Sequence, residues 1–187
     1  MKNILEVKSL SVELGVTHVI DNLSFSLSEG ENLAVIGPNG SGKTVLLRAL
    51  LGLLPHEGII RWAPGVHLGY VPQKIDLERD IPVTAMNLLS AKAALAHMGE
   101  HDVRTVARSV GVSPAILDAP LRELSGGQFQ RILIAFALLG NPNVILFDEP
   151  TASIDEAGEG QIYEMLHELQ ETRGITTIVV SHDLSFV

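Results

Sequence analysis

The segment GPNGSGKT, residues 37–44, constrains this chain more than any other stretch of its sequence. It matches the pattern G-x-x-x-x-G-K-[ST] at every defined position. The apolar run NLAVI precedes it, and VLLRALLGLL follows it with helical spacing up to Pro55. A loop of this kind between a buried strand and a helix predicts a phosphate-binding site at the start of that helix.

Each residue type in this segment has a physical role in phosphate binding. Glycines let backbone amides approach an anion without a Cβ clash, and the helix N-terminus adds partial positive charge. We predict that Lys43 reaches the β- and γ-phosphates and that Thr44 holds Mg²⁺. The alternative is a glycine-rich turn that contains Lys-Thr by chance. The predicted nucleotide contacts in this loop are Gly37, Pro38, Asn39, Gly40, Ser41, Gly42, Lys43 and Thr44.

Two acidic residues follow directly after the apolar segment NVILF, residues 143–147. Ligands of open α/β sheets bind at the carboxyl ends of the strands. We therefore predict that Asp148 holds Mg²⁺, directly or through water, and that Glu149 polarises the attacking water as a general base. A strand that ends in a solvated acidic turn is the alternative.

Two further polar residues end apolar strands. His182 follows ITTIVVS and is a candidate to contact the γ-phosphate or hold the water. Its alternative role is that of an ordinary polar residue at a strand end. Gln73 closes the segment GYVPQ, where its amide oxygen is either a candidate Mg²⁺ ligand or the cap of a turn.

The stretch LSGGQ, residues 124–128, is a second glycine-containing helix start, followed by the apolar run ILIAFALL. Ser125 is a candidate N-cap, while Gly126 and Gly127 leave backbone amides bare for an anion. The stretch has no lysine, and one nucleotide needs only one complete phosphate loop. It is therefore either structural or serves another nucleotide.

The apolar pattern predicts an α/β fold. Alternation in ILEVKSLSVEL and VIDNLSFSLSEGE predicts antiparallel strands, and GIIRWAPGVHLGYVPQ predicts two short strands around Pro64. The segments NLAVIG, NVILF and ITTIVV predict strands buried on both faces in a mostly parallel sheet. Residues 81–123 carry helical patterns only. We expect one domain, 1–187, with its core at 1–80 and 124–187 and a helical subdomain at 81–123.

Composition narrows the function classes. The formal net charge of −9 argues against a nucleic-acid partner, and the absence of cysteine excludes disulfides and cysteine-based zinc sites. The longest apolar run, ILIAFALLG, is shorter than the ~20 residues of a membrane span. The N-terminal segment has no long apolar run, so we expect no signal peptide.

Together these motifs resemble the ATP-binding cassette family, the nucleotide-binding subunits of ABC transporters. GPNGSGKT is similar to the Walker A loop, VILFDE to the Walker B strand, and LSGGQ to the family signature. YVPQ is similar to the Q-loop, ASID at 152–155 to the D-loop, and SHD to the H-loop, all in the family's order. The resemblance implies a P-loop NTPase core with an N-terminal antiparallel β subdomain, and an ATPase that uses ATP and Mg²⁺.

The resemblance also implies partners and site residues. In a head-to-tail homodimer, the signature of one chain closes over the ATP held by residues 37–44 of the other. We further expect an integral membrane permease subunit, an indirectly associated substrate-binding protein, and a location on the cytoplasmic face of the cell membrane. The implied residues outside the P-loop are Gln73, Ser125, Gly126, Gly127, Gln128, Asp148, Glu149, Asp155 and His182.

A finer resemblance, carried by GYVPQKIDLERDIPVTAMNLL, is to the ATPases of zinc importers, with similarity to those of manganese and iron. The metal passes through the membrane partner, so the chain itself needs no zinc site. His97 and His101 have the i, i+4 spacing of helical metal ligands. With Gly99 between them and no third ligand, we expect them to be solvated.

The sequence departs from the family in two places. Leu14 occupies the position near which the family has an aromatic residue for adenine, so base selectivity is in doubt and His18 is a substitute candidate. The chain stops at Val187, just after the H-loop, and we expect a truncated C-terminal end. Two rival functions follow: a non-transport cassette acting on ribosomes or DNA, and a module that binds nucleotide without hydrolysis.

Overall fold

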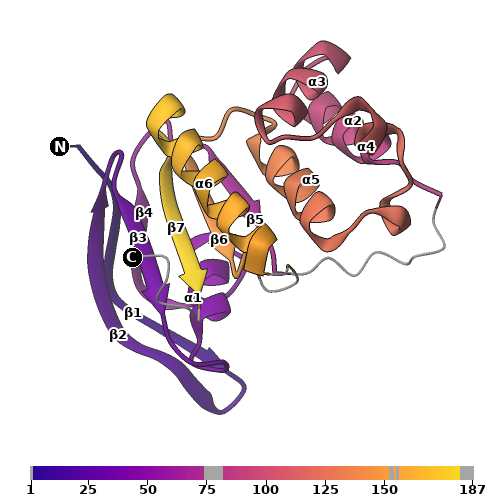
Figure 1. The fold of residues 1–187 in the computed structure, drawn as a ribbon. Helices are drawn as coiled ribbons and strands as arrows, with labels where there is room; N and C mark the ends of the chain where they lie inside the picture. The colour runs from indigo at the N-terminus through magenta and orange to yellow at the C-terminus, as the bar shows by residue number, and fades with distance from the viewer. Residues whose placement is uncertain (1, 74–81, 152–153, 155, 182–187) are drawn as a thin grey trace.

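The computed structural model describes residues 2–73, 82–151, 154 and 156–181, which form two sheets and the helices packed beside them (Figure 1). One sheet has the strand order β2-β1-β4, and the other has the order β3-β7-β6-β5. The strands are β1 (Asn3–Leu14), β2 (Thr17–Ser28), β3 (Asn32–Ile36), β4 (Glu57–Trp62), β5 (Leu68–Val71), β6 (Val144–Asp148) and β7 (Thr176–Ser181). The helices are α1 (Lys43–Leu50), α2 (Ala85–Leu95), α3 (Glu100–Ser109), α4 (Pro114–Asp118), the 3₁₀ turn η1 (Leu121–Glu123), α5 (Gly126–Leu138) and α6 (Glu156–Arg173).

The antiparallel sheet is built from the two alternating N-terminal segments, as predicted. β1 and β2 pair across a hairpin in which Gly15 has φ 64°, a backbone conformation that glycine adopts without strain. On its other edge β1 pairs with β4, with Leu5 opposite Trp62. The pairing is irregular between Val7 and Leu10, and both of these side chains are buried.

The parallel sheet has fully buried central strands and a more exposed edge. Every residue of β6 and β7 is buried, as the apolar runs predicted. β3 lies at the edge of the described sheet with β7 as its neighbour, and its residues are only half-buried or exposed, with Ile36 39 % exposed. The prediction that β3 is buried on both faces is wrong here. Apolar composition shows that a strand prefers burial, but not how many neighbours it has.

Alternate residues of β6 face two separate hydrophobic cores. Val144 and Leu146 pack in the core that contains α1 and the antiparallel sheet, whereas Ile145 and Phe147 pack in the core that contains α5 and α6. In Figure 1, α6 lies across β7 on one side of the parallel sheet. Helices and strands thus cover both faces of β6, which explains its unbroken apolar run.

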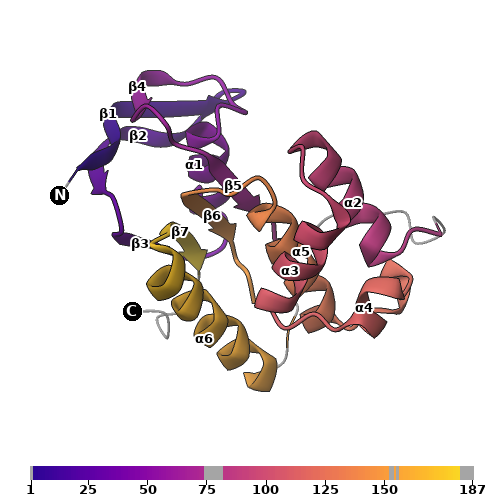
Figure 2. The ribbon, with the colours of Figure 1, turned by 90° about the horizontal axis from the view of Figure 1, so that it is seen from above.

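The helices between β5 and α5 gather on one side of the molecule (Figure 2). Thr84 caps α2 through the backbone N–H of Asn87, and Ser113 caps α4, which begins at Pro114 as predicted. An isolated bridge between Thr84 and Pro120 joins the two ends of this segment. The predicted helical character is confirmed for the described residues 82–123. The division of the chain into a core and a separate helical subdomain stays a prediction.

One local prediction is corrected and another is confirmed. α1 ends at Leu50 rather than near Pro55, because Gly52 (φ 71°) lets the amide of Leu53 turn back to the carbonyl of Arg48. His97 and His101 are both exposed, as expected, and they do not share a helix, because His97 has φ 56° in the turn before α3. Among the described residues, no cluster of three or more candidate side chains could hold a metal ion. No helix in the described ranges has the length and apolar character of a membrane span.

Candidate active site

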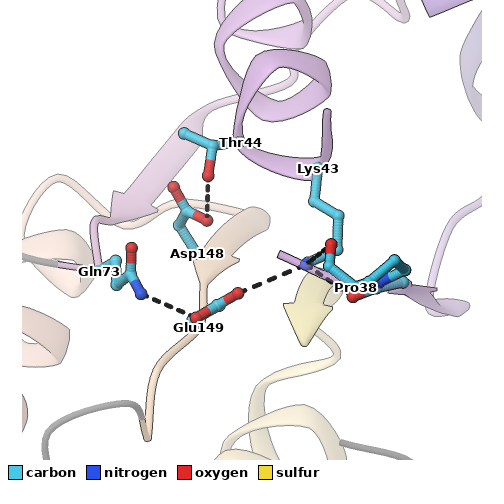
Figure 3. Close-up of polar contacts among 7 residues, drawn as sticks. Pro38, Lys43, Thr44, Gln73, Asp148 and Glu149 are labelled. Atoms are coloured by element: carbon cyan, nitrogen blue, oxygen red, sulfur yellow. Dashed lines mark hydrogen bonds and ion pairs between the residues drawn. The ribbon is translucent and has the colours of Figure 1, made fainter. Parts of the chain in front are cut away.

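The predicted phosphate loop, acidic pair and glutamine meet at the carboxyl edge of the parallel sheet (Figure 3). β3 leads into the loop that starts α1, and β6 ends at Asp148 with Glu149 directly after it. Gln73 follows the end of β5 by two residues. These strands are parallel, so their carboxyl ends share one edge, and residues about 75 positions apart come into contact there.

The loop before α1 has a conformation that only glycine supports without strain. Gly40 has φ 81°, and Gly42, the N-cap of α1, has φ 92° and ψ 5°. A Cβ on Gly42 would lie 2.8 Å from Cγ1 of Val19. No side chain of the described residues caps this helix start. The first-turn amides of α1 have no intrahelical acceptors, so this helix start fits an external anion such as a phosphate.

Lys43 is buried at the base of this loop, with its side chain 6 % exposed. Its Nζ donates to the carbonyls of Gly37 at 2.8 Å and Pro38 at 3.0 Å. It also lies 3.5 Å from Oε1 of Glu149. Its cation is therefore held among oxygen acceptors at the helix start, where it would complement an incoming phosphate.

Asp148 is 2 % exposed and receives a hydroxyl on each carboxylate oxygen. Thr44 donates to Oδ1 at 2.9 Å, and Tyr70 donates to Oδ2 at 3.3 Å. Burial raises the pKa of Asp148 above its usual range, and these two hydrogen bonds act in the opposite direction. Burial, followed by the charge of Asp148, raises the pKa of Tyr70 to about 12, so its phenol stays a donor at neutral pH.

Glu149 sits in a strained backbone conformation with φ 48°. Its amide continues the sheet by donating to the carbonyl of Val180 at 2.9 Å. Its Oε2 accepts from Nε2 of Gln73 at 2.7 Å, and Oε1 faces Lys43. A left-handed backbone at a non-glycine residue costs of order 1–3 kcal/mol and is concentrated at functional sites. Here it turns the carboxylate toward the phosphate loop.

The oxygen groups at this edge suit magnesium. A hydroxyl on Thr44 and a carboxylate on Asp148 lie 2.9 Å apart, and both are the hard oxygen ligands that Mg²⁺ prefers. Gln73 was predicted as a metal ligand through its amide oxygen. In this structure its amide nitrogen is committed to Glu149, which leaves the amide oxygen as the atom for that role.

The second helix start is organised differently and lies elsewhere. Oγ of Ser125 accepts from the amide of Gln128 at 3.3 Å, and Oε1 of Gln128 accepts from the amide of Ser125 at 3.0 Å. This is a complete capping box, so the prediction of Ser125 as an N-cap is confirmed. α1 and α5 lie apart in both views (Figures 1 and 2), so within one chain the signature does not join the phosphate loop.

Four predicted positions remain: Asp155, His182, Leu14 and His18. Asp155 and His182 lie outside the described residues. Leu14, at the end of β1, is 45 % exposed on the hairpin. His18 lies 3.1 Å from the carboxylate of Glu13 across that hairpin.

No role for Tyr70 was predicted from the sequence. In the structure, Tyr70 pairs with Leu146 in the parallel sheet. Residues two apart on a strand share a face, so Tyr70 and Asp148 point to the same side of the sheet. Without knowledge that β5 and β6 are neighbours, this relation could not be found.

The sequence pattern of ABC transporters matches residues 20–152. The chain belongs to the ABC transporter family. The family predicted from the sequence motifs is thus confirmed. The ATP-binding subunits of this family are ATPases coupled to transport. The match runs from within β2 through the phosphate loop and signature to the residues after Glu149.

Curated ABC relatives match nearly the whole chain. It is 41 % identical over 179 residues to the zinc import ATP-binding protein ZnuC of Cereibacter sphaeroides, covering 95 % of this chain and 72 % of that protein. It is 36 % identical over 188 residues to ZnuC of Yersinia enterocolitica, covering 100 % of this chain and 73 % of that protein.

Solved ABC structures confirm the predicted fold class. The cbiO1 protein of Clostridium perfringens, part of the ABC transporter complex cbiONQ, superposes with a TM-score of 0.85 at 28 % identity, covering 100 % of this chain and 81 % of that chain. The dimeric cassette MJ0796 superposes with a TM-score of 0.84 at 26 % identity, covering 98 % of this chain and 90 % of that chain. MJ0796 has also been solved as a post-hydrolysis dimer with ADP and Pi.

Proposed function

We propose that this chain is the ATP-binding and hydrolysing subunit of an ABC importer for a divalent metal ion such as zinc or manganese. The observation that carries the ATPase part is the meeting of an uncapped glycine-rich helix start, Lys43, Asp148 and Glu149 at one sheet edge. The identity to zinc import ATP-binding proteins supports the metal cargo.

The nucleotide phosphates would bind at the start of α1. The amides of residues 37–44 and the cation of Lys43 would neutralise phosphate charge there. Thr44 and Asp148 would hold Mg²⁺, which supplies positive charge at the β- and γ-phosphate oxygens when bound. Gln73 would add its amide oxygen. Asp148 is already oriented for this role by its two hydroxyl donors.

Glu149 would orient the attacking water and polarise it as a general base. Its carboxylate lies 3.5 Å from Nζ of Lys43, so the general base is adjacent to the side chain that would bind the phosphate. The hydrogen bond from Gln73 ties Glu149 to the segment after β5. A change in that segment would therefore reach the general base directly. His182 would contact the γ-phosphate side of the site.

The active unit would be a head-to-tail homodimer. Ser125, Gly126, Gly127 and Gln128 of one copy would cover the nucleotide bound to residues 37–44 of the other, and Asp155 would lie at the same junction. The separation of α1 from α5 within one chain supports this arrangement. A solved relative is dimeric and another is part of an ABC transporter complex.

The permease and the location complete the proposal. The dimer would bind an integral membrane permease between its helical part, residues 81–123, and the segment around Gln73 and Lys74, on the cytoplasmic face of the membrane. A substrate-binding protein would deliver the metal to the permease. The chain itself would neither hold the metal nor bind nucleic acid.

The ATPase is tested with Glu149→Gln. This variant keeps the shape and the contact to Gln73 but loses the base, so we expect MgATP binding to be retained and turnover to fall by roughly 10²–10⁴-fold. Glu168→Gln, at an exposed position of α6, is the control and should turn over normally. Unchanged turnover in Glu149→Gln would exclude Glu149 as the base.

The dimer and the cargo are tested separately. Specific ATPase activity should rise with protein concentration and fall toward zero in strictly monomeric samples. Zinc uptake by vesicles that contain the permease should require ATP and this chain. Full activity in the monomer would refute the shared site, and uptake of other solutes but not of zinc or manganese would refute the cargo.

A further inference from the structure

The carboxylate of Asp148 is held by hydroxyls from two different elements. Thr44, on α1, donates to Oδ1 at 2.9 Å, and Tyr70, on β5, donates to Oδ2 at 3.3 Å. Thr44 belongs to the phosphate-loop motif, whereas Tyr70 begins the segment YVPQ, in which only Gln73 was given a role. Its contact is the longer of the two and reaches the other oxygen of the same group.

Two contacts constrain a carboxylate in a way that one cannot. The terminal torsion of aspartate has a broad, twofold energy profile, so a single hydrogen bond leaves the group free to rotate about that contact. A donor on each oxygen fixes the plane of the carboxylate. Asp148 is 2 % exposed, so water cannot easily replace a missing donor.

Tyr70 is well anchored for this role. Its partly buried ring packs against the core that contains α1 and the antiparallel sheet. It pairs with Leu146 on the neighbouring strand and therefore shares the face of Asp148. Arg48, one turn after Thr44 on α1, adds a positive charge that acts on both Tyr70 and Asp148. A phenylalanine could fill the same space but could not donate.

We propose that Tyr70 is a positioning residue that holds Oδ2 of Asp148, so that Oδ1 and the Thr44 hydroxyl are presented together to the divalent cation that accompanies ATP. This inference rests on the proposed function, in which Thr44 and Asp148 are the protein ligands of Mg²⁺. Groups that orient metal ligands by hydrogen bonding commonly change metal affinity by about 10–100-fold when they are removed.

The first test compares Tyr70→Phe with the matched control Tyr163→Phe. Tyr163 is the other tyrosine of the chain, and its hydroxyl bonds to Glu159 and Thr151 instead. ATPγS binding is measured in EDTA and at increasing Mg²⁺, and Mn²⁺ affinity is measured by electron paramagnetic resonance. We expect Tyr70→Phe to bind ATPγS normally in EDTA and to bind Mn²⁺ about tenfold more weakly. Tyr163→Phe should match the wild type in both.

The second test keeps the Tyr70 hydroxyl in place. The chain has two tyrosines, so 3-fluorotyrosine incorporated into Tyr163→Phe labels Tyr70 alone. The ¹⁹F resonance should move when Mg²⁺ is added to the ATPγS complex, beyond the change caused by ATPγS in EDTA. This measurement decides the question even if Tyr70→Phe fails to fold.

The outcomes separate this inference from the proposed function. Equal Mn²⁺ affinity in Tyr70→Phe and the wild type would overturn the role of Tyr70 alone, as would a ¹⁹F resonance that is indifferent to Mg²⁺. Wild-type nucleotide binding that shows no dependence on Mg²⁺ at all would overturn both the inference and the proposed metal site.

Discussion

The two glycine-containing helix starts of this chain look alike in sequence and differ in how their backbone groups are satisfied. Gly42, the N-cap of α1, has a left-handed backbone conformation, and no side chain among the described residues caps this helix. The side chain of Lys43 is buried at the same helix start. α5 begins at Ser125, which forms a reciprocal capping box with Gln128. The free backbone amides at the start of α1 can donate to an external hydrogen-bond acceptor. At the start of α5, side chains already accept hydrogen bonds from two of the backbone amides.

This difference indicates a division of labour. An uncapped helix start with a buried lysine can bind a polyphosphate strongly by itself. A self-capped start without a lysine can add neutral donors, but it is a weak anion site alone. The second start therefore gains a role when another element brings the phosphate to it, which agrees with the proposed dimer.

Among the changes that distinguish the two helix starts, the largest effect should come from removing the cation of Lys43. Lys43→Met keeps the length of the side chain but removes all three donors, so turnover should fall by roughly 10²–10³-fold, as for loss of a single preorganised donor. A steady-state ATPase assay measures this. Lys2→Met, at an exposed lysine, should behave as the wild type. Turnover of Lys43→Met within a few-fold of the wild type would show that the two starts do not differ in charge dependence.

Replacing a glycine by alanine should change the free energy of unfolding differently at the two helix starts. Gly42→Ala forces a side chain into φ 92° and places Cβ 2.8 Å from Val19, so it should destabilise the fold by about 1–3 kcal/mol. Gly127→Ala meets Ile154 only at 3.9 Å, without positive φ, and alanine favours a helix by about 0.5–1 kcal/mol. Urea unfolding should thus give opposite signs. Equal destabilisation by both would remove the distinction.

Serine caps test whether the second start does more than end a helix. Ser125→Ala should cost about 1 kcal/mol of stability. The Ser113 hydroxyl caps α4 in a similar way, since it accepts from the amide of Ile116 at 3.4 Å. Ser113→Ala should therefore lower the stability by about the same amount as Ser125→Ala. Only Ser125→Ala should lower the concentration-dependent ATPase rate. If both variants lowered it equally, Ser125 would be a structural cap and nothing more.

The last prediction concerns the pH dependence of stability at Tyr70, which donates to Asp148. The pKa of Tyr70 is raised from 10.0 to about 12, so its protonated form stabilises the folded state fully below pH 10, and this stabilisation is lost as pH rises toward 12. The stability difference between wild type and Tyr70→Phe should therefore shrink over that range. Urea unfolding at several alkaline pH values measures it. A difference that grows with pH would have the wrong sign.

Much of the site was predictable because it depends on contiguous residues. The motif at 37–44 fixed the phosphate loop and the start of α1, and the apolar run before Asp148 fixed a strand with acids at its carboxyl end. Ser125 was correctly predicted as a cap, since capping needs only residues three positions apart. The expectation that His97 and His101 are solvated also held, since Gly99 between them is a local signal for a break in the helix.

The sequence alone determined the elements, the phosphate loop and the family, because hydrophobic period, glycine conformation and capping act over a few neighbouring residues. The tertiary structure decided which strands are neighbours. It placed β3 at the edge of the parallel sheet that the described residues form, put β4 and β5 into different sheets, and brought Gln73 to Glu149 and Tyr70 to Asp148. The residues of these two pairs lie 76 and 78 positions apart in the sequence. Their hydrogen bonds can form only after the parallel sheet has brought the two segments together. No local pattern records such a contact.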